Sequence, residues 1–450
     1  MKLIKDILNK FTPLEIIVLM VSITISTFLI VPIFTGNEQG NHNVAGDALF
    51  PTEKVYSIEG GKPVDLFDTT FYVYYEESRT EEKAEVVNVL NEYLVKYHIL
   101  FDRHHDYFAV DPVDPLFPTE TEKSTLPRVH NLKYINDHQG EVIEIEKPLF
   151  DLLSISKAHT INTPKNAFSM FIGGLYDFWK PHTNYAVVPG EEVEGPPAVD
   201  PLVNETSRLE VERLQSYIPL TATDIENTLK LWEENNKYYV TFNEFNGSGP
   251  DLSISVGAVA KGMMTDVLSE ALLEKGLSKG FINGGTSSFT FLEKGFGGKA
   301  YNINMANIEY LTEVNKSYSF SRFDKYQMST SGIYAGFRFT YNNEIVIRSH
   351  IIDPLSGYPA QQKQQAVNIA SNTLSGLELD YLTTTLSVLS EEEGMNYLRA
   401  NYASHDVNIA FIGKEASGYY VAHTKNYPGG NDAKMTVVSP YREIFLDFLQ

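Results

Sequence analysis

The sequence predicts an α+β fold, and three observations lead to this prediction. Strand-like and helix-like segments mix along the chain without a second set of start signals that would mark another domain. The stretch Phe71–Tyr75 (FYVYY) has the composition of a strand. In the stretch that follows, Val86, Leu90 and Leu94 recur at helical intervals. We therefore expect one elaborate domain over residues 66–450.

The N-terminal segment has the pattern of a membrane anchor. Three lysines in the first ten residues precede an apolar run that is nearly free of charge from Ile16 to Phe34. A bilayer-spanning helix needs about 20 residues, and the run is longer than the apolar core of a signal peptide, although cleavage stays an alternative. The lysines predict a cytoplasmic N-terminus at 1–13, a transmembrane anchor at 14–34 and a catalytic domain outside the cytoplasm. Residues 35–65 lack apolar periodicity and are predicted to be a linker.

Composition excludes several classes of protein. The formal net charge of −22, without a stripe of lysine and arginine, argues against nucleic acid as a partner. The chain has no cysteine, so disulfides and zinc–thiolate sites are excluded. Residues 187–206 are rich in proline, glycine and glutamate, and we expect an acidic excursion on the surface there.

A run of small residues begins at Ser255 with the sequence SVGAVAKG. Val259 and Met263 follow at helical spacing, and Gly276 is placed to end that helix. Lys261 would lie near the start of the helix, where backbone N–H groups and a cation together favour a phosphate. The alternative is that the small residues allow close helix packing and that the lysine is solvated.

The stretch from Glu344 to Ile352 has the β-branched content of a half-buried strand, and Asp-Pro followed by glycine predicts a turn after it. This strand would deliver His350 and Asp353 to one end of a sheet. The alternative is that the histidine ends the strand and the aspartate starts the turn without further function.

A carboxylate and a hydroxyl face one way on the predicted helix LELDYLTTTLSVL. Asp380 and Thr384 are four residues apart, and Thr383 lies beside them. Hard oxygen ligands of this kind suit Mg²⁺. Water and substrate phosphate complete the coordination of the ion. The alternative is a helix whose threonine hydroxyls bond back to its own carbonyls.

These motifs, with FINGG at 281–285 and STSGIY at 329–334, resemble the ApbE family of FAD:protein FMN transferases in order and approximate spacing. The resemblance covers roughly Leu66 to the C-terminus, and HIIDPLSGYP and LDYLTTTL are its most specific parts. The segment Asn166–Trp179 is similar to the family's flavin-side segment. The resemblance implies a T-fold-related, mixed sheet-and-helix domain that holds FAD, with Mg²⁺ between the two phosphates. It also implies transfer of FMN to a threonine hydroxyl of an extracytoplasmic partner flavoprotein, with release of AMP.

The same resemblance implies roles for particular residues. The implied metal ligands are the backbone carbonyl of Ala258 and the side chains of Asp380, Thr383 and Thr384. The implied FAD contacts are Ser255, Lys261, Ile352 through its main chain, Phe67, Asn136, Ala167, Phe168 and Ser169. The implied catalytic residues are Lys261, His350 and Asp353, and either of the last two could orient the hydroxyl or take its proton.

The chain departs from the family pattern on the FAD-binding side. Ser255 stands where aspartate is common, Asp68-Thr69 where glycine-threonine is usual, and Ser169 where an acid is usual. Two alternatives to the transferase therefore stay open. One is a metal-dependent FAD pyrophosphatase that gives FMN and AMP, and the other is a non-catalytic, membrane-anchored flavin-binding protein.

Overall fold

The computed structural model describes residues 56–58, 62–64, 67, 69, 71–75, 82–108, 126–183, 193–285, 287–293, 301–303, 315–320, 325–333, 336–429, 434–437 and 439–447. The predicted cytoplasmic N-terminus and membrane anchor lie outside these residues. Within them, no helix combines the length and the apolar character that crossing a bilayer requires.

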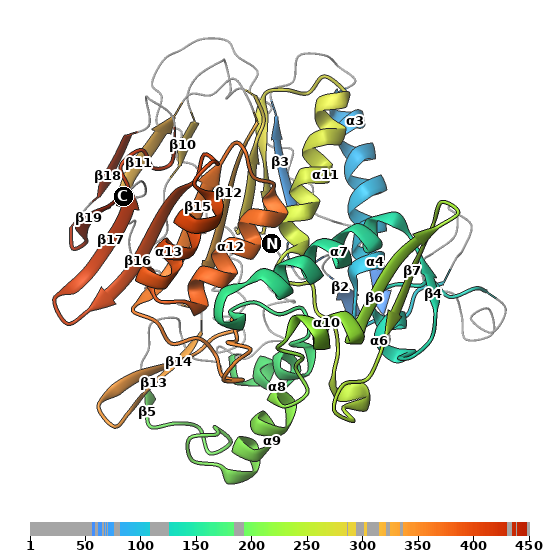
Figure 1. Ribbon diagram of the computed structural model, residues 1–450. Helices are drawn as coiled ribbons and strands as arrows, with labels where there is room; N and C mark the ends of the chain where they lie inside the picture. Colours follow the sequence, from blue (N-terminus) through green and yellow to red (C-terminus); the bar gives the residue numbers. More distant parts are fainter. Residues whose placement is uncertain are drawn as a thin grey trace, which may run out of the picture.

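An eight-stranded sheet forms the centre of the molecule (Figure 1). In spatial order its strands are β19 (Arg442–Leu446), β17 (Gly418–Thr424), β16 (Asn408–Glu415), β15 (Gln364–Ser371), β12 (Tyr326–Gly332), β9 (Ser288–Phe291), β8 (Gly280–Gly284) and β3 (Phe71–Tyr75). β17 and β19 run parallel, and the other neighbours are antiparallel. The predicted strand at Phe71–Tyr75 is confirmed as β3.

Both faces of this sheet are buried at its middle strands, whereas the edge strand β19 is largely exposed. On β15, Val367 and Ile369 pack into the core on the helical face, whereas Ala366 and Ala370 pack into a second cluster on the other face. Side chains alternate across a strand, so a strand covered on both faces has apolar residues at successive positions.

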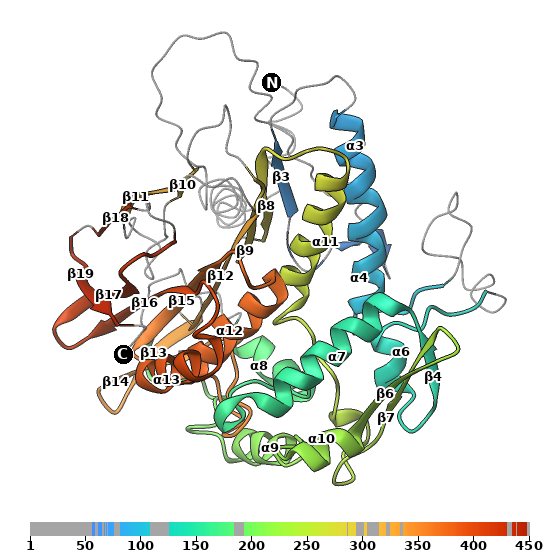
Figure 2. The same cartoon turned by 45° about the horizontal axis from the view of Figure 1, so that its top comes forward.

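Three helices cover the middle of one face: α11 (Ala260–Glu274), α12 (Gly376–Val388) and α13 (Glu391–Tyr402). The predicted helices after Ser255 and around Asp380 are confirmed as α11 and α12. α12 begins with a capping box in which Ser375 and Glu378 satisfy each other's backbone N–H groups. Figure 2 shows that α3 (Glu82–Val89) and α4 (Val95–Phe101), joined by a π-helical turn at Leu90–Leu94, lie along α11.

Further helices and strands complete the fold. The further helices are α6 (Leu132–Asp137), α7 (Lys147–Asn162), α8 (Gly173–Thr183), α9 (Glu205–Gln215) and α10 (Ala222–Thr228), with 3-10 turns at Pro164–Asn166 and Gly249–Asp251. The further strands are β1 (Tyr56–Ile58), β2 (Lys62–Val64), β4 (Ile143–Ile145), β5 (Val193–Glu194), β6 (Leu229–Glu234), β7 (Lys237–Phe242), β10 (Tyr301–Ile303), β11 (Asn315–Phe320), β13 (Phe337–Tyr341), β14 (Glu344–Arg348) and β18 (Lys434–Val437).

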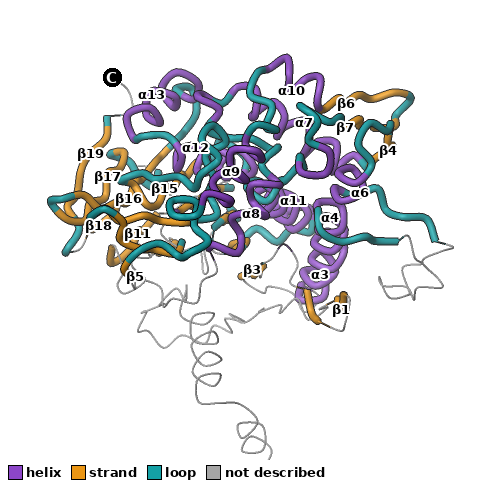
Figure 3. Tube along the Cα trace, turned by 90° about the horizontal axis from the view of Figure 1, so that it is seen from below, coloured by secondary structure: helices purple, strands orange, loops and turns teal. Residues whose placement is uncertain are grey.

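These strands form four small sheets, β1-β2, β10-β11-β18, β14-β13-β5 and β4-β7-β6. The first of them lies within the segment predicted to be a linker. Seen from below, α8 and α9 lie side by side near β5 (Figure 3). The predicted strand Glu344–Ile352 is shorter than expected, because β14 ends at Arg348 and the chain then turns.

Candidate functional site

The site is built where α11 and α12 cross. A Cβ on Gly262 would lie 2.1 Å from the carbonyl oxygen of Gly376, and a Cβ on Gly376 would lie 2.6 Å from that of Gly262. Real side chains do not approach a backbone so closely, so glycine at both positions lets the two helices touch. This contact brings the N–H of Gly262 to 2.7 Å from Oδ2 of Asp380, to which it donates.

Asp380 is buried beneath this crossing and is surrounded by hydroxyl groups. Its carboxylate accepts hydrogen bonds from Ser288 at 2.8 Å and from Ser329 at 2.5 Å. Burial raises the pKa of Asp380 to about 6, while Lys261, Ser329, Ser288 and the Gly262 N–H act in the opposite direction. The carboxylate is therefore a buried negative charge that a bound cation would stabilise.

The two threonines of α12 differ in how they are engaged. The hydroxyl of Thr383 donates to the backbone carbonyl of Asp380 at 3.2 Å and lies 2.9 Å from that of Ser331. Thr383 thus bonds partly back to its own helix, as one alternative predicted. The hydroxyl of Thr384 lies 3.4 Å from that of Ser331, a long contact that leaves its oxygen better placed to bind something else.

The carbonyl of Ala258 accepts no hydrogen bond within the part of the chain that the structure describes. In a regular helix the N–H of Gly262 would donate to it, but that N–H is directed to Asp380 instead. An unpaired carbonyl oxygen thus stands at the start of α11, in the same turn as the N–H that binds the carboxylate.

These oxygens fit a hard cation. Asp380, Thr384 and the carbonyl of Ala258 offer oxygen donors alone, the set that Mg²⁺ prefers in proteins when water and substrate complete the shell. Thr383 lies beside them with its hydroxyl already bonded. Across the described residues, no group of three His, Cys, Asp or Glu side chains could hold a metal ion.

Lys261 is the second residue of α11 and is half-buried. Its ammonium group makes no ion pair or hydrogen bond with any described residue, yet its charge acts on both Asp380 and His350. The helix N-terminus and this cation together favour an anion.

His350 lies on the corner that follows β14. His350 is an exposed residue, although protein atoms crowd its imidazole closely enough to desolvate it. Desolvation, together with the positive charge of Lys261, lowers the pKa of His350 to about 4. The imidazole is therefore neutral at physiological pH and able to accept a proton.

Asp353 shapes the turn after His350. Its Oδ1 accepts from the N–H of Leu355 at 2.9 Å, and its backbone exchanges hydrogen bonds with Gly357 and Tyr358. This is the alternative in which the aspartate starts the turn, and it leaves His350 as the better candidate for a base. Ile352 pairs with Pro359 in an isolated bridge, and its own N–H and C=O have no partner among the described residues.

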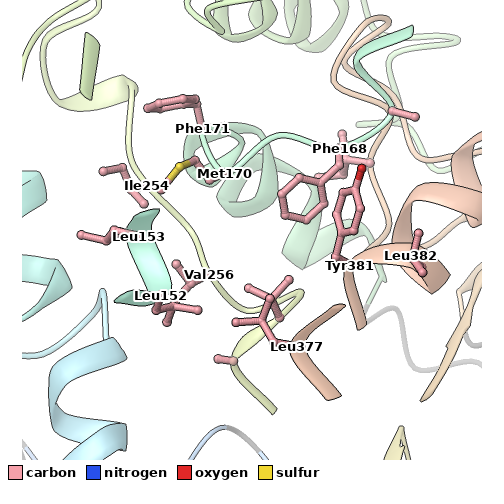
Figure 4. Packing of buried hydrophobic residues seen from close by; sticks show 14 of the residues in the cluster. Leu152, Leu153, Phe168, Met170, Phe171, Ile254, Val256, Leu377, Tyr381 and Leu382 are labelled. Carbon is pink, nitrogen blue, oxygen red and sulfur yellow. The ribbon is translucent and has the colours of Figure 1, made fainter. Parts of the chain in front are cut away.

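The predicted flavin-side residues are mostly engaged in packing. Ala167, Phe168 and Ser169 are buried in the core, and the ring of Phe168 stands edge-on to Tyr381 of α12 at 5.0 Å (Figure 4). These side chains thus point into the protein interior and do not line an open binding surface. The backbone of this segment still meets the site, since Met170 accepts from the N–H of Ser255 at 2.8 Å.

Asn136 and Phe67 also have partners within the protein. The Asn136 side chain exchanges two hydrogen bonds with the backbone of Ile254, at 3.1 and 2.8 Å, and so positions the neighbouring Ser255. Phe67 has a positive φ of 59°, and its N–H donates to Nδ1 of His98 at 3.0 Å.

Several residues of the site escaped the sequence analysis. Ser288, Ser329 and Ser331 come from β9 and β12, and the hydroxyl-rich stretches TSS and STS were the available signal. Asp266 of α11 accepts from the first two N–H groups of α12, those of Gly376 and Leu377, at 2.9 and 3.2 Å. It thus caps the helix that carries Asp380.

The fold and the site together indicate the class of protein to which this chain belongs. A mixed α+β domain carries an unpaired lysine at a helix N-terminus, next to a buried carboxylate and a free carbonyl, and this arrangement is suited to a phosphate ester with a hard cation. A sequence profile of the ApbE family matches residues 113–409, and the chain belongs to this family.

Known proteins agree with this assignment. The chain is 26% identical over 301 residues to a protein of Klebsiella pneumoniae named FAD:protein FMN transferase, covering 64% of this chain and 80% of that protein. A protein of the same name from Vibrio cholerae is 27% identical over 38% of this chain and 47% of its own length.

Solved structures share the fold. The flavin transferase ApbE from Vibrio cholerae has a TM-score of 0.56 at 18% identity, covering 81% of this chain and 96% of its own. The flavinyl transferase ApbE of Pseudomonas stutzeri has a TM-score of 0.54 at 16% identity, and the match covers 79% of this chain and 91% of that chain. At these identities the likeness concerns the fold alone.

Proposed function

We propose that this chain transfers the FMN moiety of FAD to a threonine hydroxyl of a partner flavoprotein and releases AMP. The observation that carries the proposal is the diversion of the Gly262 N–H to the buried carboxylate of Asp380, because it frees the carbonyl of Ala258 in the same turn. The names of the relatives support the choice of FAD and of a protein acceptor.

The metal site would be formed by Asp380, Thr384 and the carbonyl of Ala258, with Thr383 beside them. When bound there, Mg²⁺ would neutralise charge on the FAD phosphates. Lys261 would bind the same phosphates from the protein side, through its ammonium group and its own backbone N–H, since the neighbouring N–H groups of Ala260, Gly262 and Met263 already have acceptors. Ser255 would contact FAD. Its N–H donates to the carbonyl of Met170, and Asn136 holds the backbone of the preceding residue, Ile254.

His350 acts as the base. Its neutral imidazole takes the proton of the threonine hydroxyl as the threonine oxygen bonds to the phosphorus of the FMN half. The bond from that phosphorus to the bridging oxygen breaks, and AMP leaves with the electron pair. A positioned base contributes on the order of 10²–10⁴ in rate, and alignment of the weak hydroxyl nucleophile contributes further.

A second candidate is an FAD pyrophosphatase, which would use water as the nucleophile at the same site. The observation that favours it is the accessibility of His350 to solvent. In a transferase, the docked acceptor would have to exclude that water.

One experiment separates the candidates. The purified chain is incubated with FAD, Mg²⁺ and an acceptor domain, and AMP, free FMN and acceptor mass are measured together. The transferase gives AMP and flavinylated acceptor in equal amounts. An acceptor whose target threonine is replaced with alanine is the matched control. Equal amounts of AMP and free FMN with an unchanged acceptor would establish the pyrophosphatase, and bound FAD without products would establish a flavin-binding protein.

A further inference from the structure

A buried ion pair lies directly before the corner that carries His350. Nε and Nη2 of Arg348 donate to the two carboxylate oxygens of Asp200, at 2.7 and 2.9 Å. Both side chains are almost fully buried, at 4% and 1% exposure. The guanidinium lies over the ring of Trp179 at 5.1 Å and near those of Phe339 and Tyr358 at 5.5 and 5.9 Å.

Asp200 belongs to residues 193–215, which we call the strap. The strap begins with β5, which pairs parallel to β13, and ends with α9. Asp200 organises the turn between them. Its Oδ1 accepts from the N–H of Leu202 at 3.0 Å, and its carbonyl accepts from the N–H groups of Val203 and Asn204. The carboxylate therefore joins the strap to the end of β14.

The strap also contacts the other side of the corner. Gln215, the last residue of α9, donates to the carbonyl of Leu355 at 3.1 Å. A Cβ on Gly357 would lie 3.0 Å from Cβ of Gln215, so this part of the turn is packed closely on α9. Trp179 of α8, outside the strap, adds a hydrogen bond from its indole N–H to the carbonyl of Gly357 at 2.8 Å. The corner is thus held before and after His350 by the same segment.

We infer that Asp200 and Arg348 are positioning residues, which hold the corner so that His350 faces Lys261 and the reacting phosphate. The inference rests on the proposed function. Two parallel N–H···O bonds fix the direction of the guanidinium as well as its distance, which a single bond does not. Buried ion pairs can often be replaced by apolar residues without loss of stability, so a gain in stability does not explain this pair.

The test uses a variant that removes both charges, Asp200→Leu with Arg348→Met. Removing both avoids leaving one buried charge unpaired, which would unfold the corner for an unrelated reason. We expect the melting temperature and the KM for FAD to stay close to those of the wild type, and kcat for FMN transfer to fall by about 10- to 100-fold, since small misplacements of a reacting group have effects of this size. The matched control is Glu212→Gln, which breaks the exposed pair of Arg208 and Glu212 on the same strap. It should leave kcat unchanged.

A second readout does not depend on FMN transfer. His350 is accessible, so its rate of modification by diethyl pyrocarbonate can be followed by peptide mass spectrometry. The double variant should change that rate at least about threefold, whereas Glu212→Gln should not. If the double variant fails to fold, Asp200→Asn and Arg348→Lys are measured in the same two ways. A folded variant with wild-type kcat and a wild-type modification rate would overturn the inference. If the wild type transfers no FMN, the proposed function fails, and the modification rate alone decides whether the pair positions His350.

Discussion

Replacing Gly262 with alanine tests the helix contact on which the site depends. The added Cβ would lie 2.1 Å from the carbonyl oxygen of Gly376, and that neighbour is backbone, which cannot move aside by changing rotamer. α11 and α12 must therefore separate. Overpacking of a core typically costs about 1–3 kcal/mol, and weakening the hydrogen bond to the charged Asp380 adds about 1.5–3 kcal/mol. We expect a loss of about 3–5 kcal/mol in the free energy of unfolding.

The assay is a comparison with Gly257→Ala in the same motif. A Cβ there would meet nothing closer than Oγ of Ser255 at 3.9 Å, which is ordinary contact. Thermal unfolding should show a clearly lower melting temperature for Gly262→Ala and a nearly unchanged one for Gly257→Ala. Gly262→Ala should also weaken Mg²⁺ binding, because it separates α11, which carries the Ala258 carbonyl at its start, from α12, which carries Asp380. If the two variants were equally stable and bound Mg²⁺ equally well, the reasoning from close helix contact would be refuted.

Asp380→Asn should abolish Mg²⁺-dependent turnover, and turnover that persists at limiting Mg²⁺ would refute the metal assignment. The pKa of Asp380 is raised to about 6, above its ordinary value of about 3.9, so the metal-free wild type should lose stability relative to Asp380→Asn as pH rises from about 4 to 6. Denaturant titrations at pH 4 and 7 measure the free energy of unfolding of both proteins. If the difference between wild type and Asp380→Asn were the same at the two pH values, the raised pKa would be contradicted. The pKa of His350 is lowered to about 4 from about 6.5, so the wild type should lose stability relative to His350→Gln as pH falls through that window. His350→Gln should also lower kcat by about 10²–10⁴ with little change in FAD affinity, and a wild-type kcat would remove His350 from the role of base. Protease added to intact protoplasts should digest the catalytic domain if residues 14–34 anchor it outside the cytoplasm, and complete protection in sealed protoplasts would reject that orientation.

The sequence predicted the helices of the site well because their signals are local. The apolar spacing around Asp380 and the glycine after α11 depend on neighbours along the chain, and α12 and α11 are found where these patterns predict them. For Gly262 the alternative of close helix packing is confirmed, and its partner is Gly376.

What the sequence did not reveal depends on long-range pairing. Ser329 meets Asp380 because β12 lies beneath α12, and nothing near Ser329 in the sequence indicates this. Asp200 is one of several acids in a stretch rich in proline and glycine, and its partner Arg348 is 148 residues away. Such a residue resembles any solvated turn acid until the fold buries it. The resemblance implied that the side chains of the flavin-side segment contact FAD, but Phe168 packs against Tyr381 in the core.

The most direct test of the central claim is mass spectrometry of extracytoplasmic flavoproteins from a host strain that lacks this gene. We expect a threonine of at least one such protein to carry FMN in the wild type and to be unmodified in the deletion strain. Restoring the gene should return the adduct, and restoring it with Lys261→Ala should return it poorly, because Lys261 would no longer neutralise phosphate charge. An undiminished FMN adduct in the deletion strain, with no second transferase present, would contradict FMN transfer by this chain.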